Sequence, residues 1–267
     1  DAIAAIANGG TGHIIFLDDI DEGNAEIAIS NGKTVSLYAL KNGDTYYKYY
    51  IQGSGGGAII IGEKVTVNIY SGIYSSQYEG IRVYTDGVLN IYNGVFNKCS
   101  STWTGFVGSE AGEMVIYDGE FHGRIGAQNS TIYGGTFNDG ATLHESTIHG
   151  GLFKSFVYVR GNTTINDGTF VGISVSYASN KTLTIGGSTI ISQGIYCEEV
   201  YKCILKIVSK DVNIKAIELG SDNFDYIDFT VMASGSTLVN PINISVNSAQ
   251  QEQVVAKFVD NATAVAN

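Results

Sequence analysis

Hydrophobic and polar positions alternate in a short phrase that recurs through the middle of this 267-residue chain. Each copy has an isoleucine, two variable residues, usually a glycine, a further variable residue and then an aromatic residue. Copies begin at Ile69, Ile91, Ile116, Ile132, Ile148 and Ile165, and a faded copy begins at Ile185. A period of about 20 residues that tolerates insertions is typical of a solenoid, whose units bury their apolar faces against one another.

The alternation also predicts which side chains face outward. If each leading isoleucine points into the core, its neighbours in sequence point to solvent, because side chains alternate along a strand. Equivalent residues of stacked strands then form columns with a spacing of roughly 4.8 Å. The column after the isoleucine contains Tyr70, Tyr92, Tyr117, Tyr133, His149, Asn166 and Gly186. The column before it contains Asn68, Asn90, Val115, Thr131, Thr147, Thr164 and Thr184.

The glycine and the final aromatic residue of each copy predict a corner and a return to the core. A residue without Cβ adopts a positive φ readily, so the glycine is expected at the corner. The aromatic residues are expected to stack inside the core. They are Phe96, Phe121, Phe137, Phe153 and Phe170.

The two ends of the chain depart from this repeat. Residues 1–7 predict a short helix, which Asn8-Gly9-Gly10 ends and which caps the open first turn of the solenoid. Short strands are expected over residues 13–17, 25–30 and 34–40. After Ser221 the period is lost, and strands are expected over residues 226–233, 241–246 and 253–259. We therefore expect a solenoid over residues 1–220 and a β-rich C-terminal cap, or the start of a following module, over residues 221–267.

Two insertions interrupt the repeat. Residues 41–57 contain Tyr46, Tyr47, Tyr49 and Tyr50, and residues 100–113 contain the only tryptophan, Trp103. Insertions in solenoids become loops over one face, where binding sites often lie. Tyr47 and Trp103 are therefore candidate ligand-binding residues.

Composition narrows the class of protein. Thirty-four glycines against one proline fit tight corners and uninterrupted strands. The net charge of −11 argues against nucleic acid as a partner, and no apolar run approaches the roughly 18 residues of a membrane span. The first residue is Asp1 and no signal-like segment follows, which indicates a processed or trimmed domain. Three cysteines are too few for a disulfide framework, although Cys197 and Cys203 are close enough to bridge across a turn or to remain as thiols.

Three stretches carry a resemblance to a known family. They are Asp1-Ala-Ile-Ala-Ala-Ile6, Ile14-Ile-Phe-Leu-Asp18 and Ile29-Ser-Asn-Gly-Lys-Thr-Val35, and the phrase Ile132-Tyr-Gly-Gly-Thr-Phe137 belongs with them. Over roughly residues 1–220 the chain resembles right-handed parallel β-helices of the pectate-lyase-like superfamily, closest to those of secreted and surface-anchored bacterial proteins. The resemblance implies an all-β, right-handed parallel β-helix. It leaves the activity open, because the superfamily includes lyases, hydrolases, epimerases, adhesins and phage tailspikes.

The outer columns have three interpretations. Like residues on adjacent strands can simply stabilise one another, at roughly 0.2–1 kcal/mol per pair. Alternatively, Tyr70, Tyr92, Tyr117 and Tyr133 form a platform on which sugar rings pack, with asparagine and threonine bonding the sugar hydroxyls. Ice binding through the threonine column is disfavoured, because the unequal repeats and the bulky tyrosines spoil the regular lattice that it needs.

Polysaccharide cleavage on this fold commonly uses acidic groups, or acidic groups with a Lys or Arg base, on neighbouring turns of one face. Asp118 and Asp167 share a column but are separated by three turns, roughly 14 Å, which is too far for a cooperating pair.

A denser polar group follows the phenylalanine column. It consists of Glu120, His122 and Arg124 on one turn, Asn138 and Asp139 on the next, and Lys154 on the third. This group suits the binding of an acidic sugar or a lyase with Arg124 or Lys154 as the base, and it equally suits a hydrated surface of opposite charges.

Metal sites find little support. His144, Glu145 and His149 lack the spacing of a zinc site. The acidic turn of Asp18, Asp19, Asp21 and Glu22 is a candidate calcium site without the EF-hand spacing, and so is the group of Asp222, Asp225 and Asp228. No nucleophile elbow, phosphate-binding loop or dinucleotide fingerprint is present in the sequence.

These observations favour a non-enzymatic module that is secreted or lies at a bacterial cell surface, and that binds a polysaccharide or surface glycan. The first alternative is a polysaccharide lyase or hydrolase that uses the polar group from Glu120 to Lys154. A phage tail-fibre or tailspike segment, for which a homo-oligomer is expected, and a passive stalk are the others.

Overall fold

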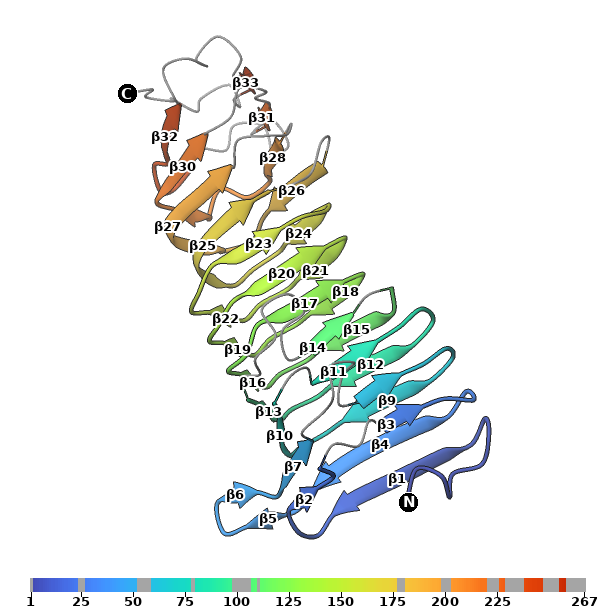
Figure 1. Ribbon diagram of the computed structural model, residues 1–267. Helices are drawn as coiled ribbons and strands as arrows, with labels where there is room; N and C mark the ends of the chain where they lie inside the picture. Colours follow the sequence, from blue (N-terminus) through green and yellow to red (C-terminus); the bar gives the residue numbers. More distant parts are fainter. Residues whose placement is uncertain are drawn as a thin grey trace. The chain divides into compact units, whose positions relative to one another are not determined.

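A computed structural model describes residues 2–23, 27–51, 59–77, 80–97, 107–109, 111–176, 181–197, 203–219, 226–228, 238–246 and 255–257. Among these residues, β-strands that pair in parallel are the dominant regular element and the structure assigns no α-helix, so the chain is all-β as expected. The chain divides into two compact units, Asp1–Gly140 and Ala141–Asn267, and each is described by itself (Figure 1).

The first unit is a parallel β-helix in which each turn of the chain contributes strands to three ladders. The Ile ladder contains β1 (Thr11–Phe16), β4 (Thr34–Ala39), β9 (Thr66–Ile69), β12 (Val88–Ile91), β15 (Glu113–Ile116) and β18 (Ser130–Ile132). The Phe ladder contains β2 (Ile20–Asp21), β7 (Lys48–Ile51), β10 (Ile73–Ser76), β13 (Val95–Phe96), β16 (Glu120–Phe121) and β19 (Thr136–Phe137). The third ladder contains β3 (Ile27–Ile29), β8 (Ile59–Ile61), β11 (Ile81–Val83), β14 (Val107–Ser109) and β17 (Ile125–Gln128).

The second unit repeats this plan. Its Ile ladder contains β21 (Ser146–Ile148), β24 (Thr163–Ile165), β26 (Lys181–Ile185), β28 (Cys203–Ile207), β31 (Tyr226–Asp228) and β33 (Val255–Lys257). The other strands are β20 (Ala141–His144), β22 (Leu152–Phe153), β23 (Val157–Val159), β25 (Thr169–Val175), β27 (Ile190–Cys197), β29 (Asn213–Ile214), β30 (Ala216–Leu219) and β32 (Asn243–Val246). Within residues 221–267, where the sequence predicts a cap, the described strands β31, β32 and β33 continue the parallel pairing.

The register confirms the assignment of the isoleucines to the core. Ile69, Ile91, Ile116 and Ile132 pair in line in the first unit, and Ile148, Ile165, Ile185 and Ile207 do so in the second. All of them are fully buried. Side chains on either side of each isoleucine therefore face outward.

The predicted aromatic stack is present inside the core. Ring centroids are 5.3 Å apart between Tyr74 and Phe96, 4.7 Å between Phe96 and Phe121, and 4.8 Å between Phe121 and Phe137. Tyr49 extends this column and is 7% exposed. It belongs to β7, so part of the segment 41–57 that the sequence predicts as a loop is a core strand. The antiparallel pair β5 (Lys41–Asn42) and β6 (Thr45–Tyr46) lies at the start of that excursion.

The recurring glycine lies at a corner with positive φ, as expected. Gly94 has φ 151° and Gly119 has φ 139°. A Cβ on Gly119 would lie 3.2 Å from the ring of Phe121 and 3.2 Å from the carbonyl oxygen of Gly94, so the aromatic residue two positions later also favours glycine here. The residue before the glycine often closes the corner, since the Asp118 Oδ1 accepts a hydrogen bond of 2.8 Å from the Gly119 N–H.

The N-terminal segment covers the start of the first unit. Residues 2–5, within the predicted helix, form turns, and the Ile6 N–H donates to the Ile3 carbonyl at 3.2 Å. The ammonium of Lys33 donates to the same carbonyl at 3.0 Å and so ties the segment to the β-helix. Within the described ranges, no helix has the length and apolar character needed to cross a membrane.

Candidate ligand-binding surface

The tyrosines predicted to form a column do lie together, on the outer side of the Ile ladder of the first unit. Ring centroids are 4.5 Å apart between Tyr70 and Tyr92, 4.7 Å between Tyr92 and Tyr117, and 5.3 Å between Tyr117 and Tyr133. The rings are almost parallel, with interplanar angles of 0°, 3° and 7°. We call this column, together with Tyr38, the Tyr ladder.

Tyr38 is a member that sequence reasoning missed. Its ring stacks on Tyr70 at 4.6 Å and 1°, because Leu37 pairs with Ile69 in the register and each tyrosine follows that core residue. This turn does not match the repeated phrase, because Leu37 stands in the place of the leading isoleucine. Comparison of Thr34-Val-Ser-Leu-Tyr38 with Thr66-Val-Asn-Ile-Tyr70 would have found it.

The Tyr ladder presents ring edges and hydroxyls to solvent rather than ring faces. Because each inner ring stacks on a neighbour above and below, both of its faces are covered. Tyr117 is 42% exposed and Tyr133 is 49% exposed. Partial desolvation, followed by the neighbouring phenols of Tyr92 and Tyr38, raises the pKa of Tyr70 above its usual value, so its hydroxyl stays protonated at neutral pH. A sugar ring therefore has no open aromatic face on the inner tyrosines, and contact with them is made at the hydroxyl edge.

A second polar column runs beside the Tyr ladder on the same strands. The Asn90 Nδ2 donates to the Asn68 Oδ1 at 2.9 Å, and the Asn68 Nδ2 lies 3.5 Å from the Ser36 Oγ. These residues lie two positions before the tyrosines, so their side chains emerge on the same face. Phenol hydroxyls and amides thus line a strip on which both donors and acceptors are available.

Among the residues that the structure describes, the stacked tyrosines of the Tyr ladder belong to the first unit. In the second unit the equivalent positions are His149, Asn166 and Gly186. The Asn166 Nδ2 lies 3.3 Å from the His149 Nδ1, which makes a polar pair where the first unit has stacked rings.

Of the two loop residues proposed as binders, Tyr47 is described by the structure and lies away from the Tyr ladder. Tyr47 is half-buried and directly precedes β7 in the Phe ladder, where its N–H donates to the Leu40 carbonyl at 3.0 Å. Trp103 lies outside the described residues.

Some of the candidate catalytic residues lie in contact on the Phe ladder of the first unit. The His122 Nε2 is 3.3 Å from the Glu120 Oε1, and the Asn138 Nδ2 is 3.1 Å from the His122 Nδ1. An amide donor at Nδ1 places the proton of a neutral imidazole on Nε2, facing Glu120. The side chains of His122 and Glu120 are 41% and 48% exposed, so solvent screens this pair and it contributes little to stability.

The two proposed bases occupy different places in the chain. Arg124 is half-buried and lies two residues after His122. Lys154 is exposed and belongs to the second unit, which is described by itself.

The remaining acidic candidates act locally on the backbone. The Asp167 Oδ1 accepts a bond of 2.7 Å from the Gly168 N–H, which matches the corner role of Asp118. In the acidic turn, Asp19 Oδ1 accepts from the Lys48 N–H and Asp21 Oδ1 from the Gly23 N–H. In the part of the chain that the structure describes, no group of three or more His, Cys, Asp or Glu residues could hold a metal ion. Asp222 and Asp225 lie outside that part, and Asp228 is described only as backbone.

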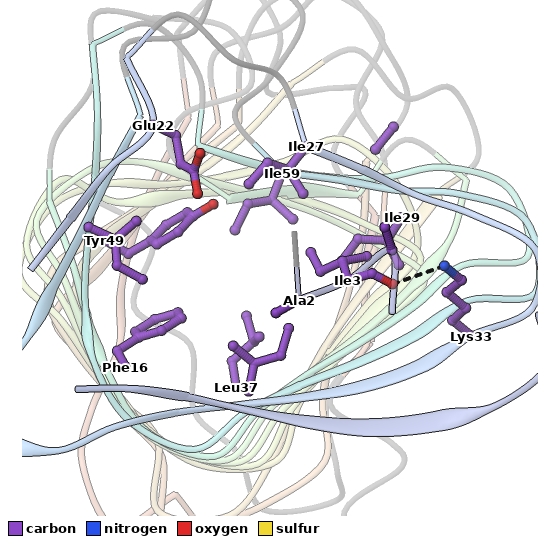
Figure 2. Close-up of a pocket in the computed structure, with 14 residues that line it drawn as sticks. Ala2, Ile3, Phe16, Glu22, Ile27, Ile29, Lys33, Leu37, Tyr49 and Ile59 are labelled. Atoms are coloured by element: carbon purple, nitrogen blue, oxygen red, sulfur yellow. Dashed lines mark hydrogen bonds between the residues drawn. The ribbon is translucent and has the colours of Figure 1, made fainter. Parts of the chain in front are cut away.

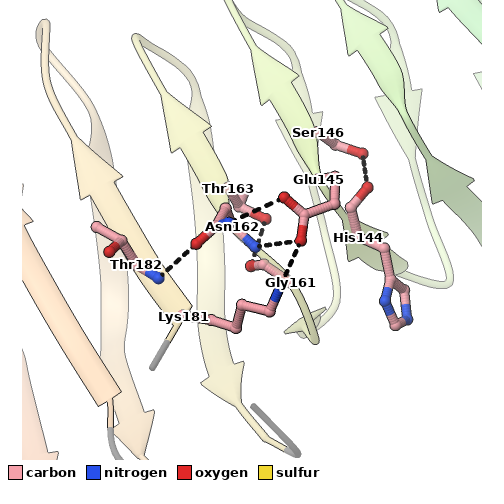
Figure 3. A network of polar contacts seen from close by, with 8 residues as sticks. All are labelled: His144, Glu145, Ser146, Gly161, Asn162, Thr163, Lys181 and Thr182. Carbon is pink, nitrogen blue, oxygen red and sulfur yellow. Dashed lines mark hydrogen bonds and ion pairs between the residues drawn. The ribbon is translucent and has the colours of Figure 1, made fainter. Parts of the chain in front are cut away.

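Glu145, which the sequence placed among weak metal candidates, joins three turns of the second unit (Figure 3). Its Oε1 accepts from the Lys181 ammonium at 2.9 Å and its Oε2 from the Asn162 Nδ2 at 3.0 Å. The Asn162 Oδ1 in turn accepts from the Thr182 N–H at 2.9 Å. The hydrogen bond from Lys181 is the main reason that the pKa of Glu145 lies below its ordinary value. Glu145 therefore links neighbouring turns of the β-helix through hydrogen bonds.

No known protein family, curated protein sequence or solved structure matches this chain. The function therefore has to be argued from the chemistry of these surfaces.

Proposed function

We propose that this chain is a non-catalytic, glycan-binding module of a secreted or cell-surface protein, and that it binds along the Tyr ladder. The observation that carries the proposal is the row of phenols at intervals of 4.5–4.7 Å from Tyr38 to Tyr117, with the Ser36–Asn68–Asn90 column beside it. A regular row of equivalent groups suits a ligand that itself repeats. A polysaccharide is such a ligand, and each of its sugars presents hydroxyls that pair with phenols and amides.

The expected contact is edge-on. Phenol hydroxyls donate to and accept from sugar hydroxyls, each such bond contributing roughly 1 kcal/mol. Affinity then comes from several turns acting on one chain, because a polymer that is bound at one tyrosine is held near the next. The net charge of −11 favours a neutral glycan over an acidic one.

The parallel β-helix is consistent with the resemblance to bacterial members of the pectate-lyase-like superfamily. That resemblance supports a bacterial, extracellular setting for the module. Within it, the exposed Tyr ladder is an adhesive surface and the stacked core is its rigid support.

The proposal is tested with a glycan array and a variant that removes hydroxyls but keeps rings. We expect Tyr92→Phe/Tyr117→Phe to weaken binding of a neutral glycan by about tenfold or more, which corresponds to the loss of two hydrogen bonds. Tyr84→Phe is the matched control, since Tyr84 is a half-buried tyrosine outside the Tyr ladder, and it should bind like the unaltered chain. Absence of binding to any neutral glycan, or full binding by the double variant, contradicts the proposal.

One observation favours a second candidate, a polysaccharide lyase. Glu120, His122 and Asn138 are in mutual contact on an open surface. Unsaturated uronates released from an acidic polysaccharide, and lost in His122→Gln but not in Tyr92→Phe, would establish this activity in place of the binding function.

A further inference from the structure

The core of the first unit is left unfilled at its beginning. A cavity of about 600 Å³ lies between the N-terminal turns and the first two turns of the β-helix. Ala2 and Ile3 line it, and Phe16, Leu37 and Ile59 surround Ala2 in the view (Figure 2). Most of this wall is hydrocarbon.

The aromatic column of the core reaches the cavity. Further along the unit the column is filled by Tyr74, Phe96 and Phe121, all of which are at most 1% exposed. At the first turn Phe16 stacks on Tyr49 at 5.2 Å, and Ile20, which is in register with Tyr49, also lines the cavity. Protein interiors are otherwise packed almost without voids larger than a water molecule. A cavity of this volume is within the range of small-molecule sites, and apolar cavities take up small apolar molecules.

Polar groups occur at two places in the wall. Lys33 is 8% exposed, and its ammonium already donates to the Ile3 carbonyl at 3.0 Å. Across the cavity, the Glu22 carboxylate and the Tyr49 hydroxyl lie on the same side (Figure 2). Burial, with a further effect of Glu22, raises the pKa of the Tyr49 phenol, which therefore stays neutral. A ligand thus meets an anionic acceptor and a phenol oxygen at this side, and hydrocarbon elsewhere.

We propose that this cavity is a binding site for a compact amphipathic amine, with its apolar body in the core and its ammonium group at Glu22 and Tyr49. An ammonium group has donors for both oxygens and carries the charge opposite to that of Glu22. A fatty acid that entered in the same orientation would place its carboxylate against Glu22, which repels it. The site is separate from the Tyr ladder and does not depend on the proposed glycan binding.

The test measures displacement of the fluorescent probe N-phenyl-1-naphthylamine from the full chain. We expect the probe to bind saturably, and decylamine to displace it at a concentration about tenfold lower than decanoate, which corresponds to one charge-assisted contact. Glu22→Gln should bring the two displacing concentrations together while leaving probe binding intact. Saturable binding that does not distinguish the amine from the acid would overturn the assignment of the ammonium group to Glu22.

A second variant tests the location. Ile20→Trp places a large side chain in the cavity and should weaken probe binding about tenfold or more, whereas Ile73→Trp makes the same change at a half-buried position on the outer side of the Phe ladder and should not. Circular dichroism and the thermal midpoint establish that each variant is folded. If Ile20→Trp does not fold, the displacing concentrations of decylamine and decanoate, compared between Glu22→Gln and the unaltered chain, still test the proposal. An unaltered chain that shows no saturable probe binding, or a folded Ile20→Trp that binds like the unaltered chain, contradicts the proposal.

Discussion

The first unit holds two aromatic columns that have the same geometry and different surroundings. In the core, Phe96 and Phe121 stack at 4.7 Å and 7°. On the outer surface, Tyr70 and Tyr92 stack at 4.5 Å and 0°. The spacing of parallel strands, roughly 4.8 Å, permits this arrangement in any aromatic column, whichever side of the sheet it occupies. Stacking by itself is therefore no sign of a binding site, and what distinguishes the outer column is its row of accessible hydroxyls.

The two columns should differ widely in their contribution to stability. A fully buried aromatic side chain contributes through removal of its apolar surface from water and through dense packing. A half-exposed one contributes mainly through the pairwise stack, about 0.5–1.5 kcal/mol. Substitutions at matched positions of the two columns test this difference directly.

The largest effect is expected in the core. Phe121→Ala should lower the free energy of unfolding by about 3–5 kcal/mol, since it removes a ring from the middle of a fully packed column and leaves a cavity. Urea denaturation followed by circular dichroism measures it. Phe121→Leu, which retains most of the buried hydrocarbon, is the control and should lose clearly less. A loss below about 1 kcal/mol for Phe121→Ala would mean that the core column packs loosely.

The next largest effect is a loss of stability at alkaline pH, which arises from buried phenols. Burial is the first cause that raises the pKa of Tyr74 above its ordinary value of 10.0, and the nearby Tyr49 adds to it. A phenol whose pKa is raised by folding contributes its stability in full below the pKa of the unfolded chain, and this stability is lost as the pH rises. Above about pH 10 we therefore expect the free energy of unfolding to fall by up to about 1.4 kcal/mol per pH unit for each such buried phenol.

Tyr74→Phe should remove the part of this pH dependence of the free energy of unfolding that Tyr74 contributes. Its cost at neutral pH is the hydrogen bond of 3.0 Å that the Tyr74 hydroxyl donates to the Ser71 carbonyl. Urea denaturation of both chains between pH 8 and pH 11 is the measurement. A slope above pH 10 that is the same for Tyr74→Phe and the unaltered chain would contradict this role of the buried Tyr74 phenol.

A smaller effect is expected in the Tyr ladder. Tyr92→Ala breaks two stacks and should lower the free energy of unfolding by about 0.5–1.5 kcal/mol per stack at most. Tyr92→Phe keeps both stacks and should change it by less than about 0.5 kcal/mol. Urea denaturation of both variants is the measurement. A loss for Tyr92→Ala as large as that for Phe121→Ala would show that the Tyr ladder is mainly a structural element.

The comparison also shows what the sequence can predict and where it stops. The repeat predicts the register, because Ile116, Gly119 and Phe121 recur at fixed offsets and each type suits only one place in a turn. It misses Tyr49, since the strand Lys48–Ile51 lies in an insertion and lacks the glycine and phenylalanine of the phrase. The column of tyrosines was foreseeable, whereas the covering of their faces depends on side-chain rotamers that the spacing alone does not specify.

The cavity and the polar contacts are still harder to predict from the sequence. The cavity beside Ile20 remains because the N-terminal turns do not fill the end of the core. A gap in packing produces no periodic pattern in the sequence. The contact of His122 with Glu120 and Asn138 could be placed by register, since these residues flank the buried Phe121 and follow the paired Phe137.

The smallest expected effect concerns a polar column in the second unit, where Glu145 joins Lys181 and Asn162. Their side chains are about two-fifths exposed, so solvent screens the pair, and Glu145→Gln should lower the free energy of unfolding at pH 7 by less than about 1 kcal/mol. Because the pKa of Glu145 is lowered from 4.5, its contribution is complete above the pKa of the unfolded chain and is lost as the pH falls. The difference between Glu145→Gln and the unaltered chain should therefore vanish in acid, while Glu218→Gln, at an exposed site, should match the unaltered chain throughout. A difference that persists in acid would mean that the carboxylate acts through packing, and that polar columns stabilise this β-helix in the same way as its aromatic ones.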